Sequence, residues 1–327
     1  MRALITGGAG FVGSHLIDLL VESGYEITVI DDLSTGKIDN IKSHLTNKCV
    51  ELIVGSANDE SIMEPLIQKC DCIFHLAATV GVELVLAQPM RTIHNMFDTT
   101  AVVMKLASRY RKKVLITSTS EVYGKSVDVP FLESGDRLEG PTTTHRWAYA
   151  SVKALDEFLA LAYYKIEDLP VSIVRLFNTV GPRQSANYGM VIPKMVRASL
   201  AGEDLIVHGD GLQTRCFCHV QEAVMGLKLV MESDDCNGEV INVGSDEEIS
   251  ILSLANIVKE QTESKSNVRL IPYEEAFPDG GFEDMRRRVP SISKVGSLVG
   301  WAPKISLRQI VTDVVKQSQS INNIDGS

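Results

Sequence analysis

The 327-residue sequence predicts an α/β protein with a doubly wound parallel sheet and a smaller, irregular C-terminal domain. Short apolar strand-like runs alternate with helix-like segments, which is the pattern of a parallel sheet covered by helices on both faces. A glycine-rich turn separates the first strand-like run from the first helix-like segment. A chain of this length can bury a large core and is expected to form roughly two domains.

The first structural unit lies at the N-terminus. Residues 1–6 are a short apolar run, which predicts a buried strand. Residues 14–23 carry apolar side chains at helical spacing, and residues 26–30 predict a second strand closed by Asp31 and Asp32. A strand, a glycine turn, a helix, a strand and an acid within about 30 residues form the dinucleotide-binding (Rossmann) fingerprint.

Each glycine of the turn has a physical role. Gly7 permits the tight turn, Gly10 lets the backbone approach a pyrophosphate, and Gly13 lets the helix pack on the strand. The helix N-terminus offers N–H groups and a positive dipole end to phosphates. Asp31 and Asp32 can bind a ribose 2′-hydroxyl and would repel a 2′-phosphate, so NAD is favoured over NADP. The alternative is that one of these acids only caps a loop.

The alternation of elements continues along the chain. Further strands are predicted at residues 50–54, 72–76, 114–117, 171–174 and 239–243, and helices at 58–69, 89–110, 147–165 and 252–262. Loops lengthen after Gly181. We therefore expect a nucleotide-binding domain over residues 1–180, rejoined by about 215–262, and a substrate-binding domain over 181–214 and 263–327. The polar tail after Gln317 is expected to fray.

Composition limits the class of protein. Apolar residues make up 44% and the net charge is −10, which argues against non-specific nucleic-acid binding. No apolar run approaches the roughly 18 residues of a membrane span, so we expect no membrane partner and a cytoplasmic protein. The six cysteines include two C-x-C pairs without zinc-ribbon spacing, so we expect no metal and a reducing compartment.

A tyrosine and a lysine four residues apart point to chemistry. Tyr149 and Lys153 face the same way on the helix predicted at residues 147–165. A lysine ammonium near a phenol favours the phenolate, which lowers the pKa of the phenol. A phenolate is a general base for an alcohol that gives its hydride to nicotinamide. The structural alternative is a core tyrosine beside a solvated lysine.

Together these motifs resemble the extended short-chain dehydrogenase/reductases that act on nucleotide sugars. The resemblance covers nearly the whole chain and rests on residues 7–13, Asp31, Asp32, 75–78, 118–124, 149–153, 175–183 and 209–215. It implies a tightly held NAD, a UDP- or related nucleotide-sugar substrate and no net redox change. It also implies a homodimer in which the helices near 90–110 and 147–165 form a four-helix bundle.

The resemblance assigns roles to particular residues. NAD would contact Gly7, Gly10, Phe11, Val12, Gly13, Asp31, Asp32, Ser34, Thr35, Gly36, Leu76, Ala77, Ala78, Asn95, Thr117, Tyr149 and Lys153. The substrate would contact Glu83, Asn178, Arg183, Val191, Gln213, Arg215 and Arg288. The catalytic residues would be Tyr149, Lys153, Thr119, Ser120, Glu121 and Arg288.

The resemblance also bears on which reaction follows oxidation at C4. Glu121 stands where simple UDP-galactose 4-epimerases carry a small residue, and a carboxylate there is similar to UDP-glucuronate decarboxylases. Arg288, two residues before Pro290, matches an arginine that approaches the sugar in those decarboxylases, and it could grip a C6 carboxylate. Decarboxylation of UDP-glucuronate to UDP-xylose is therefore the leading hypothesis.

Three alternatives stay open. A UDP-hexose or UDP-hexuronate 4-epimerase would rotate the keto sugar and return hydride to its other face. A 4,6-dehydratase is disfavoured because Ser120 replaces the aspartate of its Asp-Glu pair. A non-catalytic NAD-binding scaffold would not need Tyr149 and Lys153. Val85 replaces the tyrosine that the decarboxylases carry after residues 75–78, and Ser56 replaces an acid that usually meets adenine.

Overall fold

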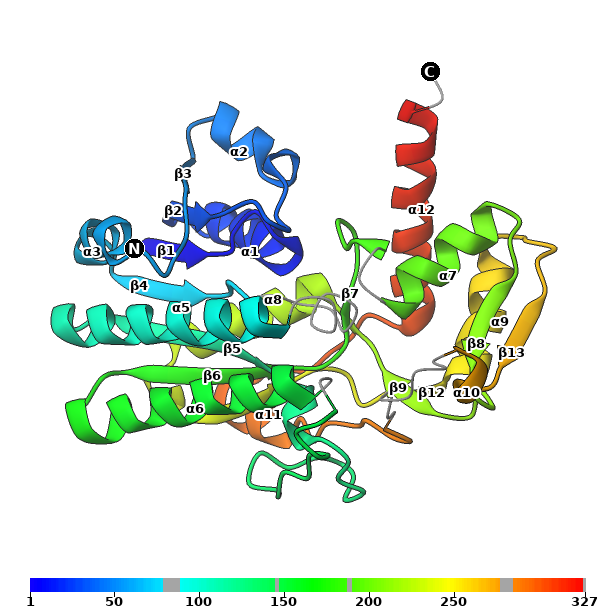
Figure 1. Ribbon diagram of the computed structural model, residues 1–327. Coiled ribbons are helices and arrows are strands. Elements are labelled where there is room, and N and C mark those ends of the chain that lie inside the picture. Colours follow the sequence, from blue (N-terminus) through cyan, green and yellow to red (C-terminus); the bar gives the residue numbers. More distant parts are fainter. Residues whose placement is uncertain (79–88, 145–146, 187–189, 277–284, 326–327) are drawn as a thin grey trace.

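The core of the molecule is a seven-stranded parallel sheet (Figure 1). The computed structural model describes residues 1–78, 89–144, 147–186, 190–276 and 285–325, with only the backbone of Arg91 and of residues 321–325. The strand order is β11-β6-β5-β4-β1-β2-β3. Its strands are β1 (Arg2–Thr6), β2 (Glu26–Asp31), β3 (Val50–Val54), β4 (Cys72–His75), β5 (Lys113–Thr119), β6 (Val171–Leu176) and β11 (Val240–Val243).

Helices cover both faces of this sheet. One face packs on α1 (Phe11–Glu22), α8 (Val220–Glu232) and α11 (Ser293–Val299). The other face packs on α3 (Glu60–Lys69), α5 (Pro89–Tyr110) and α6 (Trp147–Glu167). Two apolar clusters fill the layers between sheet and helices. The predicted doubly wound parallel sheet is confirmed.

The central strands are apolar because both of their faces are covered. Leu4 and Ile5 are neighbours in β1, yet both are fully buried, one in each apolar cluster. Successive strand residues point to opposite faces, so a strand buried on both sides needs a continuous apolar run. This is why runs without helical spacing predicted the strands correctly.

A smaller part of the molecule has its own apolar core. Helices α7 (Val191–Leu200), α9 (Ile251–Gln261) and α12 (Leu307–Asp325) pack on one another around it. The short sheets beside them are β8 (Leu205–His208) with β13 (Val268–Ile271), and β9 (Thr214–Cys216) with β12 (Glu248–Ser250). The remaining elements are η1 (Ile38–Asn40), α2 (Lys42–Thr46), η2 (Ser120–Tyr123), β7 (Thr179–Val180), β10 (Cys218–His219), η4 (Asp234–Cys236) and α10 (Tyr273–Ala276).

Helix α12 corrects the expectation of a frayed tail. It continues to Asp325 and carries the C-terminus away from the smaller part (Figure 1). Val311 and Val314 on one of its faces are buried against the neighbouring helices. The expectation was wrong because the polar residues after Gln317 extend a helix that is already nucleated and packed, which needs little apolar content of its own.

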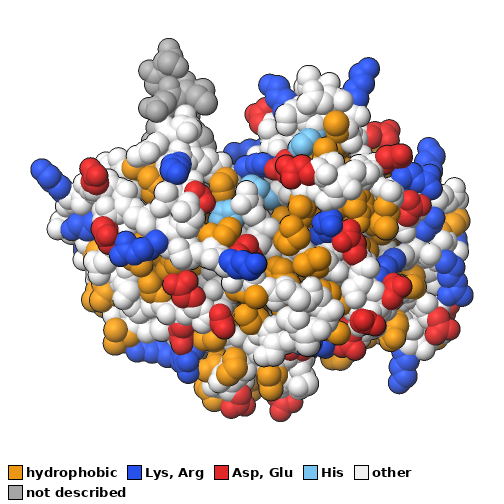
Figure 2. All heavy atoms as spheres, turned by 180° about the vertical axis from the view of Figure 1, so that it is seen from behind, with side chains coloured by type: hydrophobic (Ala, Val, Ile, Leu, Met, Phe, Trp, Pro, Cys, Tyr) orange, Lys and Arg blue, Asp and Glu red, His pale blue; other side chains and the backbone are white. Residues whose placement is uncertain are grey.

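Charged side chains are spread over the surface. On the face drawn in Figure 2, acidic and basic side chains lie interspersed rather than gathered by sign. On that face, therefore, the net charge of −10 does not make one strongly negative patch.

Candidate active site

The glycine turn is shaped by close backbone approaches. Gly7 has φ of +72°, and a Cβ there would lie 2.9 Å from the backbone nitrogen of Ala77. A Cβ on Gly13 would overlap the carbonyl oxygen of Gly7, so α1 can pack on the turn only with glycine at that position. Gly10 caps α1 without a side-chain hydrogen bond. The N–H groups of the first turn are therefore left available for an anion.

A cavity of about 840 Å³ lies over this turn, which is the size range of sites for cofactors. The predicted cofactor residues that line it are Gly7, Gly10, Phe11, Val12, Gly13, Asp31, Asp32, Ser34, Thr35, Leu76, Ala77, Ala78 and Asn95. Gly55, Ser56 and Ala57 also line it, at the position where an acid usually meets adenine, as do Ile30, Lys37, Asp39, Asn40 and Thr99, which the sequence did not identify. Gly36, Thr117, Tyr149 and Lys153 lie outside this lining.

The two acids at the end of β2 differ in their surroundings. Asp31 is 7% exposed, and its carboxylate accepts hydrogen bonds from the N–H groups of Ala9 (2.9 Å) and Leu33 (2.8 Å). Burial raises its pKa. Asp32 is exposed and caps its own turn by accepting from the N–H (2.9 Å) and hydroxyl (2.6 Å) of Ser34. Both acids line the cavity, and each retains lone pairs that can accept from ribose hydroxyls.

Gly36 belongs to the same corner. A Cβ on Gly36 would lie 2.8 Å from a carboxylate oxygen of Asp31. The absence of a side chain at Gly36 therefore leaves room for the Asp31 carboxylate, and Gly36 does not line the cavity itself.

The opposite wall of the cavity comes from late in the chain. It is formed by Arg183, Gln184, Ser185, Ala186, Met190, Pro193, Arg197, Leu200, Val314, Gln317 and Ser318. The backbone N–H of Arg183 donates to Gln317 Oε1 (2.8 Å), and its guanidinium pairs with Asp18. The structure thus places Arg183, a predicted substrate contact, in the lining of the cavity over the glycine turn. No local pattern in the sequence marks the other residues of this wall.

Tyr149 and Lys153 lie at the start of α6. Lys153 is 3% exposed, its ammonium donates to the carbonyl oxygen of Thr117 (3.0 Å), and it lies 3.6 Å from Asp156 Oδ2. Burial and the charge of Glu121 raise the pKa of Tyr149. The expectation of a lowered pKa is wrong for this arrangement, because burial of the phenol and the charge of Glu121 raise the pKa, and the charge of Asp156 adds to them. The sequence analysis missed Asp156, although it lies one helical turn after Lys153.

Glu121 and Arg288 form an ion pair beside Tyr149. One carboxylate oxygen of Glu121 lies 2.6 Å from the guanidinium, and the side chains are 18% and 9% exposed. Thr119 ends β5, and its hydroxyl accepts from the N–H of Glu121 (3.2 Å) and acts to lower the pKa of Tyr149. Asn178 lies 3.5 Å from the same guanidinium. The fold thus brings these five predicted residues together from four separate segments. Ser120, between Thr119 and Glu121, is buried.

The three consecutive arginines have different surroundings. Arg286 forms a bidentate pair with Asp210, with both distances 2.9 Å, on the surface. Arg287 pairs in the same way with Glu248, with both distances 2.8 Å. Arg288 alone of the three is buried. The resemblance that selected Arg288, two residues before Pro290, therefore identified the one buried arginine of the three.

The other predicted substrate residues lie in the smaller part. Gln213 is 6% exposed and donates to the carbonyl of His208 (2.9 Å). Arg215 is 8% exposed and donates to the carbonyls of Thr214 (2.7 Å) and Met285 (2.8 Å).

Val191 and Glu83 are the two remaining predicted substrate contacts. Val191 begins α7, one residue after Met190 of the cavity wall. Glu83, together with Val85, lies outside the described residues.

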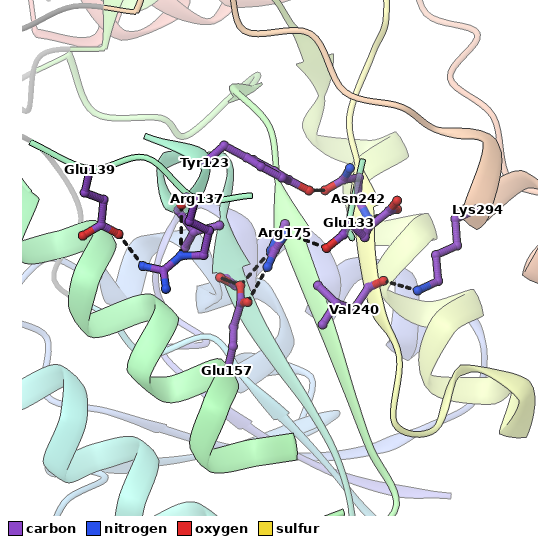
Figure 3. Close-up of polar contacts among 11 residues, drawn as sticks. Tyr123, Glu133, Arg137, Glu139, Glu157, Arg175, Val240, Asn242 and Lys294 are labelled. Atoms are coloured by element: carbon purple, nitrogen blue, oxygen red, sulfur yellow. Dashed lines mark hydrogen bonds and ion pairs between the residues drawn. The ribbon is translucent and has the colours of Figure 1, made fainter. Parts of the chain in front are cut away.

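A buried ion pair joins β6 to α6 (Figure 3). Arg175 of β6 pairs with Glu157 of α6 through two contacts of 2.9 and 2.7 Å. Glu157 also accepts from the hydroxyl of Ser118. The Arg175 guanidinium lies 4.7 Å from the centre of the Tyr123 ring, and the Tyr123 hydroxyl donates to Asn242 (2.8 Å). These contacts fix both ends of the segment that carries Thr119 to Glu121.

Among the described residues, no group of three or more His, Cys, Asp or Glu side chains could hold a metal ion. All six cysteines are free thiols, and five of them are buried. Within the same residues, no helix is both long enough and apolar enough to cross a membrane.

The glycine turn, the acids after β2 and the Tyr149–Lys153 pair at the carboxyl edge of a parallel sheet define a dinucleotide-dependent oxidoreductase-type site. A model of the family described as GDP-mannose 4,6 dehydratase matches residues 4–314. The chain belongs to this family, which confirms the predicted relationship to the extended short-chain dehydrogenase/reductases.

Relatives and solved structures agree with this assignment. The chain is 41% identical, over 98% of its length and 99% of the relative, to UDP-N-acetyl-alpha-D-glucosaminuronate decarboxylase of Bacillus cytotoxicus. It is 37% identical, over 94% and 86%, to UDP-glucuronic acid decarboxylase 5 of Arabidopsis thaliana. The structure of UDP-glucuronic acid 4-epimerase from Bacillus cereus, solved with UDP-glucuronic acid and NAD, has a TM-score of 0.88 at 26% identity, covering 98% and 100% of the two chains.

Proposed function

We propose that this enzyme catalyses the NAD-dependent decarboxylation of a UDP-hexuronate through a 4-keto sugar. The observation that carries the proposal is the Glu121–Arg288 pair beside Tyr149. A buried guanidinium at this place can bind a substrate carboxylate through two parallel hydrogen bonds. The sequence relatives named above are decarboxylases of UDP-hexuronates, which supports the same reaction.

The cavity over the glycine turn fits NAD. The turn accepts no side chain at Gly13, the first turn of α1 is uncapped, and Asp31 and Asp32 line the wall at the end of β2. These features suit a pyrophosphate and a ribose without a 2′-phosphate. When bound, NAD accepts the hydride of sugar C4 and later returns it.

The residues of the chain then supply the proton transfers. Tyr149 takes the proton of the C4 hydroxyl, and the nearby Thr119 hydroxyl favours its ionised form. The C4 ketone lies β to the C6 carboxylate, so the C5–C6 bond breaks, carbon dioxide leaves and its bonding electrons pass to the C4 carbonyl. Arg288 orients the carboxylate before this step. Glu121 and Ser120 lie where a proton can be returned to C5.

Two sugars are candidates for the substrate. They differ only at C2, which carries a hydroxyl in UDP-glucuronate and an acetamido group in UDP-N-acetylglucosaminuronate. We place the acetamido sugar first, because identity is higher to the relative named for it (41%) than to those named for UDP-glucuronate (35–37%). UDP-glucuronate, the substrate predicted from the sequence, is second.

A 4-epimerase is the second candidate function. The fold of UDP-glucuronic acid 4-epimerase is very similar, with a TM-score of 0.88, and that reaction also begins with oxidation at C4. The difference lies in what happens to the ketone, because a decarboxylase breaks the C5–C6 bond and an epimerase keeps it. The product therefore separates the two functions.

The test is to incubate the purified protein with NAD and each UDP-hexuronate in turn, and to measure carbon dioxide and product mass. We expect carbon dioxide and a UDP-pentose or UDP-4-keto-pentose. A product of unchanged mass with inverted C4 would establish the epimerase. The absence of any product from either sugar, with NAD bound, would refute both functions.

We further propose that residues 1–180 chiefly bind NAD and that the smaller part binds the nucleotide sugar. The apolar core around α7, α9 and α12 supports a separate smaller unit. By packing, α9 lies with that unit, whereas α8 and β11 lie with the central sheet.

We propose that the protein acts as a cytoplasmic homodimer built through α5 and α6. These helices pack on each other and expose large apolar side chains, among them Ile93 (40%), Leu155 (48%) and Phe158 (63%). Such exposure on adjacent helices is typical of an interface. Light scattering should give twice the chain mass of 35.8 kDa, and Phe158→Glu should give the monomer mass.

A further inference from the structure

A buried carboxylate lies beside the Tyr149–Lys153 pair and has no part in the function proposed above. Asp156 is 1% exposed and lies one helical turn after Lys153 on α6. Its carboxylate is 3.6 Å from the Lys153 ammonium. Neither carboxylate oxygen accepts a hydrogen bond of ordinary geometry from any residue that the structure describes. Aspartates are almost never fully buried unless they are paired, and Lys153 is the ion-pair partner of this one.

A row of neutral side chains lies near Asp156 and begins with Thr100. The hydroxyl of Thr100 lowers the pKa of Asp156, while burial raises it. Thr100 Oγ1 is 3.2 Å from His75 Nε2, and His75 Nδ1 is 2.8 Å from Thr6 Oγ1. Thr6 Oγ1 also accepts from the N–H of Ala77 (3.1 Å), and the Thr100 hydroxyl donates to the carbonyl oxygen of Met96 (3.1 Å). This row of contacts fixes the position of the Thr100 side chain.

No other cation reaches Asp156 from this row. Burial and the charge of Lys153 lower the pKa of His75 to about 3, so its ring is neutral at neutral pH. The charged groups around the reaction site come as three pairs, Lys153–Asp156, Glu121–Arg288 and Glu157–Arg175. Burial raises the pKa of Tyr149 most, and within this set the negative charges of Glu121 and Asp156 raise it further.

We propose that Asp156 is a positioning residue that sets the pH at which Tyr149 becomes a base. It holds the Lys153 ammonium between its own carboxylate and the Thr117 carbonyl, and it offsets the charge of that ammonium. Tyr149 consequently stays a neutral phenol in the free site. The inference rests on the proposed function in one respect, which is that Tyr149 is the base for the C4 hydroxyl.

The test is Asp156→Asn in the full-length protein, which removes the charge and keeps the shape. Without the carboxylate, the Lys153 ammonium is no longer offset, so the pKa of Tyr149 should fall by about one unit. At one alkaline pH at which circular dichroism shows an intact fold, the tyrosinate-to-tyrosine ratio at Tyr149 should rise about tenfold. Ultraviolet difference absorbance measures tyrosinate, and adding Tyr149→Phe isolates the signal among eight tyrosines.

The matched control is Asp168→Asn. Asp168 follows the end of α6, twelve residues beyond Asp156, which is roughly 18 Å along a helix axis. Its φ of +53° is a conformation that asparagine also adopts. This variant should leave the tyrosinate signal of Tyr149 unchanged. An unchanged or weaker signal in Asp156→Asn would overturn the proposal.

Asp156→Ser keeps the proposal testable if Asp156→Asn does not fold. It removes the same negative charge from beside Lys153 with a smaller side chain. The Tyr149 signal should rise in this variant as well, and no rise would count against the inference. This absorbance measurement needs no sugar. Failure to decarboxylate either UDP-hexuronate would therefore refute the proposed function, but it would not change the conclusion from the tyrosinate absorbance.

Discussion

The cofactor cavity and the reaction site lie at the same edge of the sheet, but they are formed by different kinds of chemical group. One wall of the cavity is mostly backbone, shaped by Gly7 and Gly13 with Asp31 as its main acid. The reaction site is made of charged side chains that meet in pairs from separate segments, such as Glu121 with Arg288. A backbone cradle is sensitive to added atoms, whereas paired buried charges are sensitive to the loss of either partner.

The largest effect should come from the base in the reaction site. Tyr149→Phe removes the phenolic oxygen but keeps the ring, so the rate of C4 oxidation should fall by about a thousandfold. Absorbance of the reduced cofactor in a single turnover measures this step. Affinity for NAD should stay near the wild-type value, because Tyr149 lies outside the lining of the cavity. Oxidation at the normal rate would remove Tyr149 from the mechanism.

The next effect tests whether geometry or charge matters at the ion pair. Arg288→Lys keeps the charge and loses the planar fork, so carbon dioxide release should fall by about a hundredfold while C4 oxidation continues. Product mass spectrometry should then show a 4-keto hexuronate. Arg287→Lys is the control, because that side chain pairs with Glu248 on the surface. Equal losses in the two variants would mean that Arg288 acts only through its surroundings.

The cavity should respond to added volume instead. Gly13→Ala places a Cβ against the carbonyl of Gly7, which must move, and affinity for NAD should fall roughly tenfold or more. Gly24→Ala is the control, because nothing lies within 4 Å of a Cβ there. It should cost some stability at φ of +78° and leave NAD binding unchanged. Calorimetric titration measures both affinities.

The smallest effect concerns stability and pH. Because His75 has a pKa of about 3 in the folded state and about 6.5 unfolded, the unfolded chain binds an extra proton between these values. The contribution of His75 to the free energy of unfolding is therefore full above about pH 6.5 and is lost as the pH is lowered toward 3. His75→Gln should make this slope shallower in urea unfolding. The exposed His94→Gln should leave it unchanged, and equal slopes in all three proteins would contradict the assignment.

The sequence located the cavity better than the reaction site. Residues 7–13 with Asp31 and Asp32 are local, so their spacing alone placed them around one turn. The opposite wall, with Arg197 and Gln317, comes from helices that meet only in the folded chain. At the reaction site, Glu121 and Arg288 were identified by resemblance, but their direct contact was not predicted.

By itself, the sequence determined the parallel sheet, the glycine turn and the Tyr149–Lys153 pair, because each depends on contacts within a few residues or on continuous apolar runs. The tertiary structure decided which of the three consecutive arginines turns inward and which acid stands beside Lys153. It also reversed the expected direction of the pKa shift of Tyr149. Burial and the position of neighbouring charges determine that shift, and both exist only once distant segments have packed together.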